Sequence, residues 1–228
     1  MTRHDNTGRR AYRAPRREAA AARTRESIVR AAGQLFEERG WAPTTVRSVA
    51  ERAGVSQKTV EALFGTKAAL LQAAVDHAIR GDADPLPMPQ RAAVARIELA
   101  SSAAQMLDLH AAHLRRVNER SADIALVVEQ ASCDDPLVAS LWNAMNRNRA
   151  FAVDWATTVL LKKPGRRKGL RRRDVEASFW VALDWGTYRT LTRHARLAAA
   201  EYETWLRRYY RLVFLEPSAG PRESRRSA

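Results

Sequence analysis

The stretch TTVRSVAERAGVSQKTVEALFGTKAALL, from Thr44 to Leu71, decides the fold of this chain. Its apolar residues recur at three- and four-residue spacing, which predicts two short helices joined by a glycine turn at residues 53–55, and then a third helix. We expect Thr44 or Thr45 to cap the first of these helices and Ser56 to cap the second. This layout is that of a helix-turn-helix, which places its second helix in the major groove of DNA.

Helical patterns continue on both sides of this stretch. Upstream, residues 16–39 place apolar side chains on one helix face, and Gly40 follows where the helix ends. Downstream, Pro85, Pro87 and Pro89 interrupt the pattern and mark a boundary. Beyond it we expect helices at about residues 91–118, 120–132, 137–162, 172–194 and 199–215, and no strand.

These patterns predict an all-α protein with two domains. The first residues are polar and arginine-rich and contain Gly8 and Pro15, a composition typical of disorder. We therefore divide the chain into a disordered basic arm at residues 1–17, a helix-turn-helix domain at 18–82, a larger helical domain at 83–216 and a flexible tail at 217–228.

Composition narrows the possible partners. The 228 residues carry a formal net charge of +14, and the pI is near 11.0, so polyanionic partners are favoured, with nucleic acid first. The single cysteine, Cys133, excludes an internal disulfide framework and a thiolate metal cage. No apolar run approaches the ~20 residues that cross a bilayer, and the basic N-terminus lacks the apolar core of a signal peptide. We expect a cytoplasmic protein that uses neither a membrane nor a cofactor.

A resemblance to a known family rests on residues 25–75, RESIVRAAGQLFEERGWAPTTVRSVAERAGVSQKTVEALFGTKAALLQAAV. The matching pieces are the AA-x-x-LF ending of the first helix, the TTV-x-x-VA-x-x-AGVS core and the F-x-x-K-x-x-LL opening of the last helix. In order and spacing they resemble the DNA-binding domain of TetR-type transcriptional regulators, closely over about residues 22–82. The stretch at residues 188–215 is similar to the last helices of one branch of that family, more loosely.

The resemblance implies a fold and a set of partners. The fold is all-α, with an N-terminal three-helix helix-turn-helix DNA-binding domain and a larger C-terminal helical domain for effector binding and dimerisation. The partners are a palindromic double-stranded DNA operator, a second copy of the chain and a small organic effector. Together with the residues, this predicts a sequence-specific DNA-binding transcriptional regulator, a repressor that the effector releases.

The outward face of the predicted recognition helix carries polar residues suited to base edges. Gln57 can pair with adenine, Lys58 can donate to guanine, and Thr59 can contact a thymine methyl group or a phosphate. Helix starts offer free amide donors to phosphates. The predicted DNA contacts are Thr44, Thr45, Arg47, Ser56, Gln57, Lys58, Thr59, Glu61 and Lys67.

Glu61 departs from the family pattern, which usually has tyrosine at this position. A carboxylate there repels phosphate, but it can accept a hydrogen bond from the N4 amino group of cytosine. The alternative is that Glu61 pairs with a nearby basic side chain and touches no DNA.

The second domain offers candidates for an effector site. Large apolar and aromatic side chains with a few polar partners suit a small organic ligand, although the same residues also suit ordinary core packing. The candidates are Met106, Leu109, His113, Leu126, Trp142, Met145, Phe151 and Trp155. His110 and His113 lie one helical turn apart, but no carboxylate or cysteine partner is evident, so we expect no metal site.

The resemblance also places the last two helices in a four-helix bundle with a partner copy. Their apolar and aromatic side chains exceed what a thin helix pair needs internally, although packing within one chain is the competing interpretation. The candidate interface residues are Phe179, Trp180, Leu183, Leu191, Tyr202, Trp205, Leu206 and Tyr209.

The segment KKPGRRKGLRRRD at residues 162–174 is strongly basic. A solvated charge run is one interpretation of its residues 162–173, and a second contact with nucleic acid or another acidic partner is the other. An alternative function follows from it, a sequence-tolerant, nucleoid-type DNA-binding protein driven by the basic arm and this loop. We expect no enzyme, because no nucleophile elbow, phosphate loop, zinc-binding helix or paired-carboxylate pattern is present.

Overall fold

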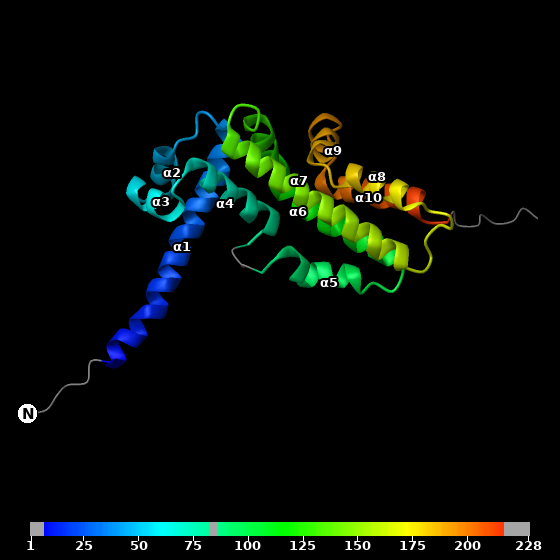
Figure 1. The fold of residues 1–228 in the computed structure, drawn as a ribbon, viewed down its shortest axis with the longest axis horizontal. Helices are drawn as coiled ribbons and strands as arrows, with labels where there is room; N and C mark the ends of the chain where they lie inside the picture. Colours follow the sequence, from blue (N-terminus) through cyan, green and yellow to red (C-terminus); the bar gives the residue numbers. More distant parts are fainter. Residues whose placement is uncertain (1–6, 83–85, 217–228) are drawn as a thin grey trace, which may run out of the picture. The chain divides into compact units, whose positions relative to one another are not determined.

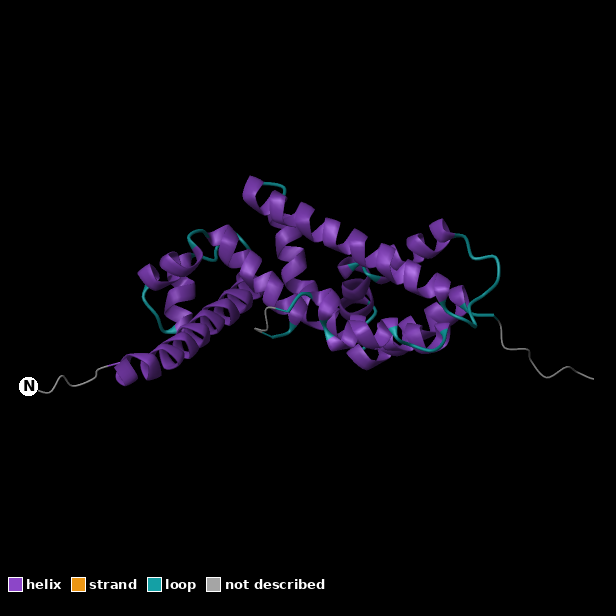
Figure 2. Ribbon diagram, turned by 60° about the horizontal axis from the view of Figure 1, so that its bottom comes forward, coloured by secondary structure: helices purple, strands orange, loops and turns teal. Residues whose placement is uncertain are grey.

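The computed structural model describes residues 7–82 and 86–216, which form helices and connecting loops (Figure 1). Figure 2 shows no strand in this described part of the chain, and the all-α prediction is confirmed. The chain forms two compact units. Unit 1 comprises residues up to 84 together with 123–143, and unit 2 comprises residues 85–122 and those from 144 onwards.

Unit 1 contains the helix-turn-helix. Its helices are α1 (Thr7–Arg39), α2 (Val46–Ala53), α3 (Gln57–Phe64) and α4 (Lys67–Arg80). Helix α1 packs against α2 and α4, and α2 packs against α3. The apolar stripe of α1 is buried, as predicted, at Ile28, Ala31, Ala32, Leu35 and Phe36.

The end of α6 (Ala103–Ala131) and the start of α7 (Pro136–Lys162) also belong to unit 1. Val128 and Val138, which flank the turn between these two helices, are completely buried. The helix-turn-helix unit is therefore larger than the predicted domain at residues 18–82, because it includes this α6–α7 hairpin.

Helix α1 begins earlier than the sequence pattern predicts. The disordered arm is expected over residues 1–17, whereas α1 begins at Thr7, and residues 1–6 lie outside the described residues. Alanine and arginine are good helix formers, and extending an existing helix costs less than nucleating one. The arginine and alanine residues at positions 9–14 are compatible with this extension. The predicted tail at residues 217–228 also lies outside the described part.

Local signals set the turn between α2 and α3. Gly54 has φ +69°, and its N–H donates to Glu51 O at 3.3 Å while the N–H of Val55 donates to Ala50 O at 3.0 Å. This pair of bonds is a Schellman motif, which uses glycine because a left-handed residue ends the helix. Ser56 then caps α3, since its Oγ accepts from the Thr59 N–H at 3.1 Å. The glycine turn and the Ser56 cap are both confirmed.

Unit 2 is built from helices around an aromatic core. Besides most of α6 and α7, it contains η1 (Met88–Gln90), α5 (Ala92–Glu98), α8 (Arg172–Ala182), α9 (Trp185–Arg189), the π-helical turn η2 (Thr190–His194) and α10 (Ala199–Phe214). The rings of Phe179 and Phe214 stack with centroids 5.1 Å apart, and Tyr210 lies 5.7 Å from each. All three are completely buried.

Two of the helices predicted in unit 2 are interrupted, and local capping explains both interruptions. The expected helix at 91–118 is interrupted after Glu98, because Ser102 caps α6 by accepting from the Gln105 N–H at 3.2 Å. Helix α6 then continues through residue 119 without the expected break. The expected helix at 172–194 is interrupted at Asp184, whose Oδ2 accepts from the Thr187 N–H at 2.7 Å and starts α9.

Among the helices of the described part, none combines the length and the apolar character that a membrane span requires.

Candidate nucleic-acid interface

The outward face of α3 keeps its polar side chains accessible. Val60 is completely buried on the inner side, whereas Gln57, Lys58 and Glu61 are exposed. The Gln57 Nε2 group donates to Glu61 Oε1 at 2.7 Å. Glu61 therefore has a neutral amide as its partner, and not the basic side chain that the sequence interpretation considered.

The hydroxyl groups at the start of α3 are engaged with each other. Ser56 Oγ lies 2.8 Å from Thr59 Oγ1, in addition to capping the helix. Thr59 is half-buried. These two residues therefore have a structural use that the sequence pattern predicts only for Ser56.

Two neighbouring threonines at the start of α2 differ in burial and in their hydrogen bonds. Thr45 is exposed and forms a capping box with Ser48, in which the Ser48 N–H donates to Thr45 Oγ1 at 3.0 Å and the Thr45 N–H donates to Ser48 Oγ at 3.1 Å. Thr44 is completely buried, and its hydroxyl donates to Gly40 O at 2.8 Å. The predicted phosphate contact of the Thr44 side chain is therefore wrong, because that hydroxyl anchors the α1–α2 loop.

The basic side chains near these helix starts differ in exposure and in the contacts that they make. Arg47 is exposed and pairs with Glu51 at 2.9 Å, an ion pair between neighbours on one helix that contributes little stability. Lys67, at the start of α4, lies over the Trp41 ring at 4.1 Å, and burial lowers its pKa. Lys67 thus stabilises its own unit through a cation–π contact as well as standing at a helix N-terminus.

Arg25 of α1 makes a structural contact with α3. Its guanidinium lies 4.4 Å from the Phe64 ring centroid and donates to Leu63 O at 3.2 Å, so it joins α1 to the end of α3. Phe64 is half-buried beneath this contact, while Leu63 is 38% exposed. The interaction is non-local, and no sequence signal identifies it.

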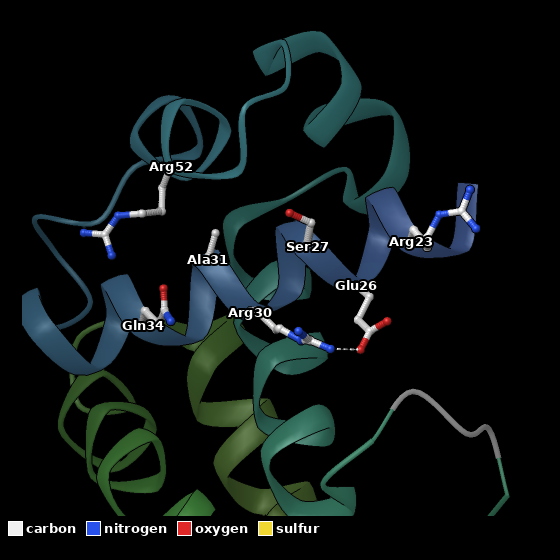
Figure 3. Close-up of a pocket in the computed structure, with 7 residues that line it drawn as sticks. All are labelled: Arg23, Glu26, Ser27, Arg30, Ala31, Gln34 and Arg52. Carbon is white, nitrogen blue, oxygen red and sulfur yellow. Dashed lines mark hydrogen bonds and ion pairs between the residues drawn. The ribbon is translucent and has the colours of Figure 1, made fainter. Parts of the chain in front are cut away.

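An open pocket of about 450 Å³ lies along α1 and reaches Arg52 of α2 (Figure 3). Figure 3 shows Arg30 turned towards Glu26, with which it forms an ion pair. Arg52 donates to both carboxylate oxygens of Glu38, at 3.1 and 2.8 Å. Two of the three arginines that line the pocket are therefore already paired, and we assign no ligand to it.

The basic segment at residues 162–174 also uses its charges within its own unit. Three of its side chains donate to backbone carbonyls near helix ends. Lys163 donates to Glu98 O at 2.6 Å, Arg166 to Leu161 O at 2.8 Å, and Arg167 to Leu212 O and Leu215 O at 2.6 and 3.2 Å.

These carbonyls belong to the C-terminal ends of α5, α7 and α10, where the negative end of the helix dipole favours a cation. Arg172 forms ion pairs with Asp154 and with Glu176. Several side chains of the segment therefore stabilise helix ends within unit 2.

The predicted effector-site residues do not form one group within a unit. Leu126 and Trp142 belong to unit 1, and the other six belong to unit 2. Met106 and Met145 are buried, and Leu109 and Trp155 pack against the core cluster that contains Met106. Phe151 is 61% exposed, so it lies at the surface of unit 2 and not with the buried candidates. Its position in a helical pattern does not reveal which side of α7 faces inward.

The predicted dimer residues divide into two groups. Phe179, Leu183, Tyr202 and Leu206 are buried within unit 2 itself, so the competing interpretation, core packing, holds for them. Their partners include α6, which the sequence pattern does not place beside the last helices. The remaining candidates are half-buried and only border the core: Trp180, Leu191, Trp205 and Tyr209.

A buried polar network in unit 2 was not predicted. His110 Nδ1 lies 2.9 Å from the Tyr210 hydroxyl, and Asn118 Nδ2 donates to the Tyr202 hydroxyl at 3.3 Å. Burial lowers the pKa of His110 to about 3, and burial together with Arg116 and Arg120 lowers that of His113 to about 4. His110 is therefore a neutral residue of the buried core.

The sequence around the helix-turn-helix matches known proteins. Residues 28–74 match the family described as bacterial regulatory proteins, tetR family. The HTH-type transcriptional repressor Rv3405c of Mycobacterium tuberculosis is 43% identical over 77 residues, which are 34% of this chain. The match spans only 38% of that relative's length.

Solved structures extend the likeness to the fold of both units. The repressor NalD of Pseudomonas aeruginosa aligns with a TM-score of 0.65 at 18% identity, over 86% of this chain and 98% of that one. A transcriptional regulator of Saccharomonospora viridis, solved in complex with choline, aligns with a TM-score of 0.61 at 16% identity, over 85% and 98%. Residues 28–74 of the chain are thus similar in sequence to the tetR family of bacterial regulatory proteins, and its two units are similar in fold to these solved regulators.

Proposed function

We propose that this protein is a sequence-specific DNA-binding transcriptional regulator, a repressor that acts in the cytoplasm. The observation that carries the proposal is the exposed polar face of α3, which is capped at Ser56 and held in a helix-turn-helix unit. The match of this unit to a family of regulatory proteins supports the same function. The role is one of binding, and we assign no catalytic role to any residue.

Five of the predicted DNA contacts remain accessible for this function. Gln57, Lys58 and Glu61 face outward on α3, and Thr45 and Arg47 stand at the exposed start of α2. Arg47 and the free amide groups of the helix start suit phosphates, while the α3 side chains suit base edges. Ser56 and Lys67 retain a place at the interface by their position at helix starts, whereas the N–H and the hydroxyl of Thr59 are both engaged with Ser56.

A homodimer on a palindromic operator is the second part of the proposal. One helix-turn-helix contacts only a few base pairs, so a symmetric dimer that binds two half-sites is the usual arrangement. Trp180 is half-buried and its neighbour on α8, Val181, is 48% exposed. Burying these side chains against a second copy removes apolar surface from water.

A small organic effector is the third part. Thr157 of α7 is completely buried in unit 2, and among the described residues its hydroxyl has no hydrogen-bond partner. A buried polar atom without a partner is costly, and a bound ligand with a polar group would satisfy it. The choline complex of the Saccharomonospora regulator supports a ligand in this fold. Such a ligand would favour a dimer geometry that no longer fits the operator.

The proposal is tested by DNA binding across a salt series. Purified protein is titrated against DNA from around its own gene and against random DNA of equal length. A preference of ~10³-fold or more for one palindromic fragment is expected of a specific regulator. Equal binding to both, with a steep salt dependence, would instead indicate the sequence-tolerant, nucleoid-type alternative.

A further inference from the structure

The Gln57–Glu61 pair is an unusual feature on a surface meant for DNA. The two side chains lie one helical turn apart on the exposed face of α3, joined by the hydrogen bond from Gln57 Nε2 to Glu61 Oε1. An exposed carboxylate raises the cost of approaching phosphates. We therefore expect the Glu61 carboxylate to make a favourable hydrogen bond with a base edge, which offsets its repulsion from phosphates.

The pair presents mainly hydrogen-bond acceptors to a ligand. A carboxylate only accepts, and Gln57 directs one of its two N–H groups to that carboxylate. What Gln57 offers outward is its amide oxygen and one remaining N–H group. The contact with Glu61 also decides which end of the amide faces the carboxylate, so the amide oxygen is turned away from it.

The major groove contains few donors that such a surface can meet. Only the N6 amino group of adenine and the N4 amino group of cytosine donate there, whereas guanine O6 and thymine O4 are acceptors and repel a carboxylate. An amide with one free N–H group and a free oxygen still matches the N7 and N6 edge of adenine.

We propose that the Gln57–Glu61 pair is the specificity-determining element of α3, which selects a cytosine opposite Glu61 through its N4 amino group. Gln57 acts as the positioning residue that fixes the carboxylate, and it reads an adjacent adenine with its remaining groups. Lys58, exposed on the same helix, supplies the complementary donor for guanine. This inference rests on the proposed function, because it names the bases that the operator contains.

The first experiment selects binding sites from a random DNA library with the wild-type chain and with the Glu61→Ala and Glu61→Gln variants. The wild-type consensus is expected to contain an invariant cytosine in each half-site, and both variants are expected to lose the preference at that position alone. The Glu129→Ala variant is the control, because it removes the same charge from an exposed site on α6. Its consensus is expected to stay unchanged.

The second experiment removes one functional group from the DNA. Replacing the selected cytosine by 2-pyrimidinone deletes the N4 amino group and keeps the ring. The wild type is expected to lose about tenfold or more in affinity, and Glu61→Ala is expected to bind both duplexes equally. Gln57→Ala is expected to show a smaller ratio between the two duplexes than the wild type, because the carboxylate is no longer fixed.

The outcomes separate the two proposals. A wild-type consensus that Glu61→Ala leaves intact would overturn the role of the pair and retain the regulator function. Equal losses on 2-pyrimidinone for the wild type and Glu61→Ala would do the same. No consensus from the wild-type chain would overturn the proposed function, and this inference with it.

Discussion

On α3, Gln57, Lys58 and Glu61 are exposed, whereas in the basic segment at residues 162–174 the side chains of Arg166 and Arg167 donate to the carbonyls of helix ends. In the sequence, both regions suggest a nucleic-acid contact. The structure distinguishes them by the partners that their polar groups already have. A basic run beside several helix C-termini is attracted to them first, so charge in a sequence is not the same as charge available to DNA.

Unit 2 also contains polar side chains that are buried and bonded to one another. His110 is buried against Tyr210, and Asn118 against Tyr202. In unit 1 the polar groups of α3 face outward. We therefore expect changes in unit 2 to alter stability, and changes on α3 to alter DNA binding. The following predictions sharpen or break this distinction, from the largest effect to the smallest.

The largest expected effect is the acid sensitivity of unit 2. His110 has a folded-state pKa of about 3 and His113 of about 4, both below the ordinary value of 6.5. The unfolded chain therefore binds protons that the folded chain does not, and the free energy of unfolding falls as pH drops below 6.5. Each site contributes up to ~1.4 kcal/mol per pH unit.

Chemical denaturation at a series of pH values measures this slope. The double variant His110→Leu/Tyr210→Phe, which removes both partners together, should show a shallower dependence on pH. A slope identical to that of the wild type would show that His110 is not the titrating group.

The Arg167→Ala variant tests the structural use of the basic segment. It removes the hydrogen bonds from a charged donor to Leu212 O and Leu215 O, and should lower the free energy of unfolding by about 1.5–3 kcal/mol. Operator affinity of the folded protein should not change. Thermal or denaturant unfolding, paired with a DNA titration, gives both quantities, and the opposite pattern would place the segment at the DNA.

The Lys58→Ala variant makes the converse test on α3. Operator binding should weaken by ~1–3 kcal/mol, because a donor to a base edge is lost. Stability should be almost unaffected, since Lys58 is exposed. Lys168→Ala, an exposed lysine of the basic segment, is the matched control. Equal titration curves for the wild type and Lys58→Ala would remove this residue from the interface.

The smallest of these effects is expected at the turn that orients α3. Gly54 has φ +69° and open space where a Cβ would lie, so Gly54→Ala should destabilise unit 1 by about 1–2 kcal/mol through backbone strain alone. Denaturant unfolding measures the change. A loss much above this range would mean that the α2–α3 angle itself has shifted.

The features that the sequence predicts well are those set by neighbours along the chain. The glycine turn at Gly54, the cap at Ser56 and the buried stripe of α1 all follow from local chemistry. The apparent competition between Thr44 and Thr45 for the cap is decided by the loop from Gly40, which buries Thr44.

The errors concern partners that lie far apart in the sequence. Phe179 and Tyr202 are predicted as interface residues, but they pack against α6 within unit 2, and no sequence pattern predicts that Arg25 contacts Phe64. Periodicity indicates that a face is apolar, but it does not identify what covers that face. The buried pair of His110 and Tyr210 is separated by a hundred residues, so no local pattern reveals it.

The most direct test of this account is the salt dependence of operator binding for two matched double variants. Arg47→Ala/Lys58→Ala removes two exposed basic residues from the head, and Lys168→Ala/Arg173→Ala removes two from the basic segment. We predict that the first variant loses affinity and that its slope of log affinity against log salt concentration falls by about 1, while the second variant behaves as the wild type. A loss of slope in the second variant and none in the first would contradict the account.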